Sequence, residues 1–106
     1  MSTQLRRMEE QIERIKRVLL TLGPMRPGSI TRQYRLPKEK KRPFYQISYT
    51  RQMHGHTEYV RPEHLPVLRR ETATFRRFRK LIDRWVALAL KVSKIRIAHT
   101  NISTRR

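Results

Sequence analysis

The sequence predicts an α+β fold in which an N-terminal helix, a three-stranded antiparallel β-meander and a long C-terminal helix follow one another, with the helices packed as an antiparallel pair or coiled coil. Apolar residues recur at spacings of three and four near both ends of the chain, which indicates amphipathic helices. The middle changes to a two-residue alternation rich in Tyr, Ile and Thr, which is typical of strands. A chain of 106 residues is also short enough to form one domain. We therefore predict a single domain over 1–106, with a helix at 3–22, a sheet at 29–60, a helix at 62–98 and a basic tail at 99–106.

The first predicted helix carries one narrow apolar stripe. Its members alternate spacings of three and four, which is the a/d pattern of three heptads. Gly23 and Pro24 follow the last periodic residue. This pair is typical of a helix end, because Gly reaches left-handed dihedral angles and Pro cannot continue the hydrogen-bond ladder. The stripe consists of Leu5, Met8, Ile12, Ile15, Leu19 and Leu22.

Three short strands are predicted over residues 29–35, 44–51 and 56–60. Between the first two, Pro37 and Pro43 enclose five consecutive charged residues. No core would accept such a turn, so we expect it to lie in solvent, free to reach a phosphate backbone.

The connection between the second and third strands sets their register. His54 and Gly55 form a plausible two-residue hairpin turn, with Gly supplying a positive φ, and this turn would place Tyr49 opposite Val60. A longer loop would instead place Tyr49 opposite Tyr59. The sequence leaves both registers open.

The last predicted helix begins near Pro62 or Pro66 and is about 50 Å long at about 1.5 Å per residue. Its apolar face widens in its second half. One short helix cannot cover that face, so we expect the remainder to form a coiled-coil-like homo-oligomer. The apolar stripe consists of Leu68, Phe75, Phe78, Ile82, Trp85, Ala89 and Val92, and is widened by Leu81, Val86, Leu88 and Ile95.

The charge of the chain points to an anionic partner. There are 26 Lys and Arg residues against 8 Asp and Glu, giving a formal net charge of +18, and Arg outnumbers Lys 19 to 7. So small a chain repels itself unless a partner neutralises it, and guanidinium groups make the better paired contacts to phosphate and guanine. Nucleic acid is therefore the first candidate, with DNA favoured over RNA.

The candidate nucleic-acid-binding residues come from the turn, the sheet and the start of the long helix. Amide, hydroxyl and guanidinium groups on a small antiparallel sheet are typical of base-edge readout in a major groove. The interleaved tyrosines are either half-buried core residues or stacking platforms for unpaired bases, and the sequence leaves both roles open. The candidates are Lys38, Lys40, Lys41 and Arg42 in the turn, Arg32, Arg35, Gln46, Ser48 and Arg51 in the sheet, and Arg69, Arg70, Arg76 and Arg77 in the helix.

Several classes of protein are disfavoured. No stretch of 18 apolar residues and no apolar signal core are present, so we expect no membrane partner and a cytoplasmic location, nucleoid-associated if the protein binds DNA. There is no Cys, and His54 and His56 form the only local histidine pair, so no metal site is predicted. The carboxylates are scattered and no glycine-rich phosphate loop occurs. We therefore predict no catalytic residues, no cofactor and no enzymatic activity.

Four segments, residues 23–35, 43–49, 57–63 and 75–78, resemble an uncharacterised bacterial family of small basic proteins. Its members are often encoded beside transposases and other mobile-element genes, and the resemblance covers residues 23–92. Some relatives carry a Cys-containing loop between the first two strands, where this chain has none, so any metal site of that loop would be missing. The three strands and following helix are also similar to the arm-type DNA-binding domains of tyrosine integrases, which read DNA through the sheet.

The charge, the sheet and the resemblance together predict a DNA-binding, mobile-element-associated protein that oligomerises through its helices. Three alternatives stay open. The protein could instead serve a ribonucleoprotein as an RNA-binding accessory, it could be a coiled-coil adaptor for a recombinase or transposase, or, least favoured, its basic helix could lie on a membrane surface.

Overall fold

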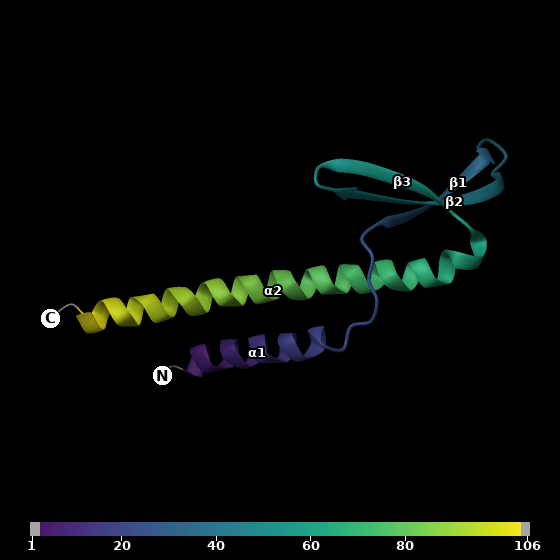
Figure 1. Cartoon of the computed structure of the whole chain (residues 1–106). Coiled ribbons are helices and arrows are strands. Elements are labelled where there is room, and N and C mark those ends of the chain that lie inside the picture. The colour runs from purple at the N-terminus through teal and green to yellow at the C-terminus, as the bar shows by residue number, and fades with distance from the viewer. Residues whose placement is uncertain (1–2, 105–106) are drawn as a thin grey trace. The chain divides into compact units, whose positions relative to one another are not determined.

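The computed structural model describes residues 3–104, and side chains up to residue 100. It confirms the predicted α+β fold of two helices and a three-stranded antiparallel sheet (Figure 1). The described chain forms two compact units: a helical unit, residues 3–22 and 77–104, and a sheet unit, residues 23–76. Helix α2 is divided between them, its first part in the sheet unit and the rest in the helical unit. The elements are α1 (Thr3–Leu19), β1 (Ser29–Leu36), β2 (Lys41–Arg51), β3 (His54–Val60), the 3-10 helix η1 (Pro62–His64) and α2 (Leu65–Thr104).

The helical unit is an antiparallel pair, as the heptad stripes predict. Near its ends, Arg96 of α2 donates a hydrogen bond of 2.8 Å to Glu9 of α1, and the Lys16 ammonium lies 5.4 Å from the centre of the Trp85 ring. Residue numbers rise along one helix as they fall along the other, which fixes the direction. The core between them comprises Leu5, Met8 and Val92, with Ile12, Leu88 and Ile95 packed around it.

Helix α1 ends earlier than its apolar stripe indicates. The last helical residue is Leu19, so the predicted end at Leu22 is wrong. The Thr21 hydroxyl donates a hydrogen bond of 2.7 Å to the carbonyl of Val18, as does its backbone N–H at 2.9 Å. These two hydrogen bonds give the Val18 carbonyl its partners in a turn that ends the helix. Leu20, which lies off the stripe, is 87% exposed.

Helix α2 runs farther than its periodicity indicates. Residues 99–104 are helical, so the predicted helix end at residue 98 is wrong, while residues 105–106 lie outside the described part. Losing an apolar stripe removes a reason for packing but does not stop a helix, and no Gly or Pro occurs in this segment. The Thr100 hydroxyl donates to the Arg96 carbonyl at 3.0 Å, one turn earlier.

The sheet has the order β1-β2-β3, with both pairs antiparallel (Figure 1). Strand alternation divides its side chains between two faces. One, which we call the covered face, carries Ile47, only 1% exposed, and Val60, and these line the same hollow as Leu68 of α2. The other, the open face, has no buried apolar residue among those described.

The turn between β2 and β3 is at Gln52 and Met53, with φ of 51° and 67°, so the predicted turn at His54 and Gly55 is wrong. Two positive φ angles are what a two-residue type I′ hairpin turn requires. Gly55 instead pairs with Thr50 inside the ladder, and Tyr49 lies opposite His56. Neither register considered from the sequence is the observed one.

The charged turn between β1 and β2 is shorter than predicted. It occupies residues 37–40, and β2 begins at Lys41, so Lys41 and Arg42 belong to the start of the strand. Lys40 and Arg42 have positive φ angles of 52° and 55°. The side chains from Lys38 to Arg42 are exposed, as the charge run predicts.

The segment that enters β1 is fixed by backbone contacts. The Arg26 N–H donates a hydrogen bond of 3.1 Å to the Glu71 carbonyl in α2. Gly28 then has φ +147°, and a Cβ added to it would lie 2.7 Å from Cγ1 of Ile47. Only glycine allows the chain to pass so close to the most buried residue of the sheet.

Candidate nucleic-acid interface

The open face of the sheet is a polar surface formed by all three strands. Gln46 on β2 lies between Thr31 on β1 and Tyr59 on β3. Beside them, the hydroxyls of Ser48 and Thr57 are 3.1 Å apart. The side chains of this face include those of Thr31, Gln33, Arg35, Phe44, Gln46, Ser48, Thr50, Thr57 and Tyr59.

The open face is flanked by positive charge. The Arg35 guanidinium lies 5.1 Å from the centre of the Phe44 ring, and the exposed lysines of the 37–40 turn follow directly on β1. The sheet unit carries twelve Lys or Arg residues and four Glu, a net charge of +8. None of the four carboxylates is on the open face: Glu39 is in the turn, Glu58 is on the covered face, and the other two are in η1 and α2.

Glu58, on the covered face, is already engaged. It accepts hydrogen bonds from Arg26 at 2.7 Å and from the Tyr49 hydroxyl at 3.1 Å. These two donors stabilise the carboxylate and lower the pKa of Glu58 below its ordinary value of 4.5. Tyr49 also stacks on His56, with ring centres 4.9 Å apart, so the cluster ties the entering segment to β2 and β3.

A cleft of about 430 Å³ lies at the covered face, where side chains from β1, β2 and α2 converge. Three arginines, Arg32, Arg69 and Arg76, line it, together with Tyr45. The remaining lining residues are Ile30 and Thr72.

The predicted candidates are thus divided among several surfaces. Arg35, Gln46 and Ser48 share the open face, and the exposed basic turn adjoins it. Arg32 and Arg51 alternate onto the other face, so the structure does not place them with the amide and hydroxyl groups. Arg70 is exposed and does not line the cleft. Arg77 is the first residue of α2 that belongs to the helical unit.

The cleft joins a sheet arginine, Arg32, to two helix arginines, Arg69 and Arg76, a convergence that the sequence did not predict. The spacing of Arg69, Thr72 and Arg76 places these residues on one helix face, which was a usable signal. The contact of the Tyr45 ring with the Arg32 and Arg69 guanidiniums depends on the strand register, so it could not be predicted from the sequence.

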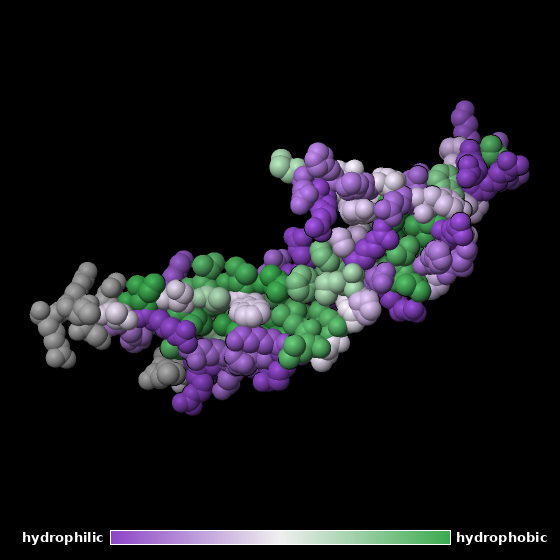
Figure 2. All heavy atoms as spheres, in the orientation of Figure 1, coloured by the Kyte–Doolittle hydropathy of each residue, from purple (hydrophilic) through white to green (hydrophobic). Residues whose placement is uncertain are grey.

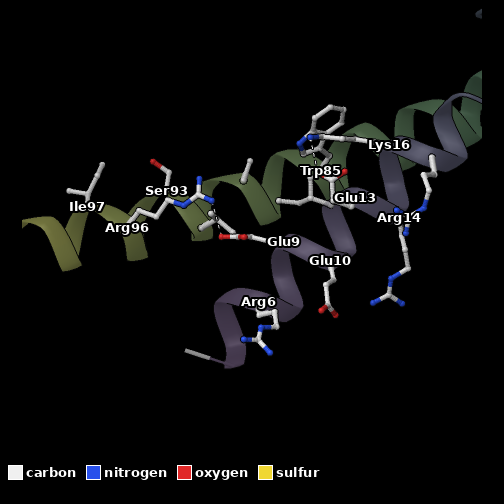
Figure 3. Close-up of a pocket in the computed structure, with 14 residues that line it drawn as sticks. Arg6, Glu9, Glu10, Glu13, Arg14, Lys16, Trp85, Ser93, Arg96 and Ile97 are labelled. Atoms are coloured by element: carbon white, nitrogen blue, oxygen red, sulfur yellow. Dashed lines mark hydrogen bonds and ion pairs between the residues drawn. The ribbon is translucent and has the colours of Figure 1, made fainter. Parts of the chain in front are cut away.

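The helical unit has a groove of its own, about 890 Å³ in volume (Figure 3). Charged side chains of α1, including Glu9, Glu10 and Glu13, form one wall, and Trp85 and Arg96 of α2 lie on the other. Two of these three carboxylates are paired, Glu9 with Arg96 and Glu13 with Lys16 at 3.0 Å. The groove therefore carries both charge signs, unlike the arginine-lined cleft.

The chain is an α+β protein whose sheet unit combines a covered face, a polar open face and an arginine-lined cleft. Comparison with protein-family models, with curated proteins and with solved structures finds no match. The resemblance to small basic proteins encoded near transposases therefore stays a prediction.

Two further observations concern the described residues alone. No three His, Asp or Glu side chains among them gather closely enough to hold a metal ion. None of their helices is both long and apolar enough to span a membrane.

Proposed function

We propose that the protein binds nucleic acid, with duplex DNA as the first choice, through the open face of its sheet and the adjoining basic turn. The observation that carries the proposal is the composition of that face. Amide, hydroxyl and guanidinium groups from three strands share it, and none of the four carboxylates of the sheet unit is there. A surface whose only role is to keep the protein in solution usually carries charges of both signs.

The open face supplies the groups that recognise base edges. A B-DNA major groove is about 12 Å wide and admits antiparallel strands. Gln33 and Gln46 present amides, which pair with adenine. Ser48 presents a hydroxyl, which can donate to or accept from a base edge. Arg35 adds a guanidinium suited to guanine or to phosphate.

The turn at residues 37–40 supplies phosphate contacts. Lys38 and Lys40 are exposed and lie beyond the end of the open face, and Lys41 and Arg42 follow in β2. Such contacts position a protein on the duplex without reading its sequence. Each neutralised phosphate contributes about 0.9 to the slope of log affinity against log salt concentration.

The test is binding to a random-sequence duplex over a salt series, comparing the wild type with Lys38→Glu/Lys40→Glu. We expect the double variant to bind more weakly at every salt concentration and to lower the salt slope by about one unit or more. The matched control is Lys91→Glu/Lys94→Glu in the helical unit, which makes the same change in net charge. If both double variants lose the same affinity, the site assignment is wrong, because net charge alone would explain the loss.

Unpaired RNA or single-stranded DNA is the second candidate, favoured by one observation. Tyr59 lies on the open face and is 59% exposed, so its ring is accessible for stacking on a base. Replacing Tyr59 with Leu should weaken single-strand binding about tenfold and leave duplex binding nearly unchanged if stacking is its role. A preference for hairpin RNA over duplex DNA at matched salt would favour the ribonucleoprotein alternative.

Association of the chain through α2 remains part of the proposal. Val86, Leu90 and Ile97 are each more than half exposed and share one helix face, since the spacings of four and seven return to the same side. Figure 2 shows apolar residues gathered along α2 of the helical unit and charged residues over α1. A second copy of the chain is the proposed partner for this stripe, and a recombinase or transposase is the competing one.

A further inference from the structure

We infer that the cleft lined by Arg32, Arg69 and Arg76 is a binding site for one phosphate group. It lies on the covered face of the sheet, whereas the proposed nucleic-acid surface is the open face. The inference therefore does not depend on the proposed function. The ligand chemistry is that of a phosphate, either at the end of a nucleic acid or on a small molecule.

The three arginines come from the β1–β2 strand pair and from helix α2. Arg32 lies directly opposite Tyr45 in the β1–β2 ladder, so both side chains are on the covered face. Arg69 and Arg76 are seven residues apart on α2, two turns along one helix face. A strand pair and a helix thus both contribute arginines to the lining of one cleft.

Tyr45 contacts two of these guanidinium groups, and the Tyr34 ring, 5.7 Å from the Arg32 guanidinium, contacts one of them as well. The Arg32 guanidinium is 5.9 Å from the centre of the Tyr45 ring and the Arg69 guanidinium is 5.8 Å from it. Cation–π contacts of this kind restrict long side chains that would otherwise be free in solvent. An arginine that is already oriented loses less conformational entropy on binding an anion.

The cleft has no internal counter-charge. Arg26 and Arg96 elsewhere in the chain each donate to a carboxylate, at 2.7 and 2.8 Å. None of the three cleft arginines has such a partner among the described side chains, and no Asp or Glu lines the cleft. The three exposed arginines therefore present an uncompensated positive charge at one cleft, which attracts an anion.

Phosphate is the anion that this arrangement suits best. A guanidinium presents a planar fork of donors that matches phosphate oxygens in pairs. A phosphate monoester has three terminal oxygens and a charge of about −1.5 to −2 near pH 7, enough to engage three arginines. A diester within a chain carries a single charge, so we expect the cleft to favour a terminal monoester.

The experiment is calorimetric titration of the full chain with inorganic phosphate, a nucleoside 5′-monophosphate and a dinucleoside monophosphate that has only a diester. Sodium chloride keeps the ionic strength equal in all titrations. We expect phosphate and the mononucleotide to bind and the diester to bind about tenfold more weakly. If neither inorganic phosphate nor the mononucleotide binds above the chloride background, the inference is overturned.

Arg76→Gln is the principal variant, since Arg76 makes no ring contact with Tyr45 and its loss should leave the fold intact. Arg69→Gln is the second variant. We expect each to reduce the affinity for phosphate about tenfold or more. Arg70→Gln is the matched control, one residue from Arg69 yet outside the cleft, and it should bind as the wild type does. Equal losses in all three variants would mean a general charge effect and would overturn the site.

The source of the phosphate is distinguished by a second comparison. Two oligonucleotides of one sequence, with and without a 5′-phosphate, are titrated against the wild type and Arg76→Gln. A terminal-phosphate preference in the wild type that Arg76→Gln abolishes identifies a nucleic-acid end as the ligand. Tight binding of the mononucleotide with no such preference identifies a small phosphorylated molecule. Because the turn variant Lys38→Glu/Lys40→Glu lies outside the cleft and should leave phosphate binding unchanged, the two proposals fail separately.

Discussion

Individual residues fix the entry of the chain into the sheet, and Gly28 is the most constrained of them. An added Cβ would meet two side-chain carbons of Ile47, at 2.7 and 2.9 Å, in a backbone region that other residues rarely adopt. We expect Gly28→Ala to lower the free energy of unfolding by about 1–3 kcal/mol, measured by urea denaturation. Gly23→Ala is the matched control, because nothing lies within 4 Å of a Cβ there. Equal effects of both variants would contradict this account.

Glu58 makes one contribution to stability dependent on pH. Its pKa in the folded chain is lowered below 4.5, mainly by the hydrogen bond from Arg26 and then by that from Tyr49. A lowered carboxyl pKa stabilises the fold above the unfolded pKa, and this stabilisation is lost as the pH falls through the folded pKa. The contribution is therefore complete above about pH 5.5 and declines below about pH 4.5.

The corresponding experiment compares the melting temperatures of the wild type and Glu58→Gln between pH 3 and pH 7. We expect the wild type to melt higher near neutral pH and the two curves to converge in acid. An NMR titration of Glu58 should also show its pKa moving up toward 4.5 in Arg26→Gln, which removes the first donor. A difference in melting temperature that is constant over the whole pH range would contradict the role of the charge.

At the scale of elements, the β2–β3 hairpin carries a turn sequence poorly suited to its conformation. Gln52 and Met53 both have positive φ, and Met53 is 95% exposed, so its side chain contributes little packing to offset the strain. Asn-Gly is the preferred type I′ pair. We expect Gln52→Asn/Met53→Gly to raise the free energy of unfolding by about 1 kcal/mol or more, since each left-handed residue costs about 1–2 kcal/mol.

A second substitution tests the location of that turn. Gly55 lies in the ladder opposite Thr50, with open space around a Cβ, so Gly55→Ala should stabilise the strand by about 0.5–1 kcal/mol in the same denaturation assay. If the turn were instead at His54 and Gly55, where Gly would need a positive φ, the same change would destabilise the hairpin.

The elements themselves could be predicted because periodicity is a local signal. Apolar residues at spacings of three and four identified both helices, and the two-residue alternation from Ser29 to Val60 identified the sheet. The ends could not be predicted as well, since local hydrogen bonds decide them: Thr21 bonds back to Val18 and ends α1 before its stripe does. The hairpin register likewise depends on two left-handed residues, Gln52 and Met53, that sequence preference would not select.

The candidate site was predictable in its residue types and in the alternation of each strand. Charge and composition identified the basic turn and the amides, and alternation placed Gln46 and Ser48 on one face in any register. The neighbours of Gln46, which are Thr31 and Tyr59, depend on the observed pairing. The convergence of Arg32 with Arg69 requires residues far apart in sequence to meet across a sheet and a helix. No local pattern contains that information, so the cleft could be found only in the structure.

At the scale of the whole molecule, the charge of +18 has opposite effects on the two proposed kinds of association. Binding to nucleic acid releases counterions and weakens as salt increases. Association of two copies brings like charges together. Salt screens the repulsion between them and therefore strengthens the association. The direction of the salt effect therefore separates the two processes within one protein.

The exposed stripe of α2 allows this distinction to be tested. Leu90 is 56% exposed between Val86 and Ile97, so we expect Leu90→Ser, which leaves the net charge unchanged, to weaken dimerisation tenfold or more. Ala87→Ser, also exposed on α2 but about a quarter turn away from the stripe, is the control and should behave as the wild type. Light scattering with size-exclusion chromatography at low and high salt, without nucleic acid, measures the result. A wild type that stays monomeric at high salt would exclude a second copy as the partner of the stripe and leave a recombinase or transposase as the occupant to test.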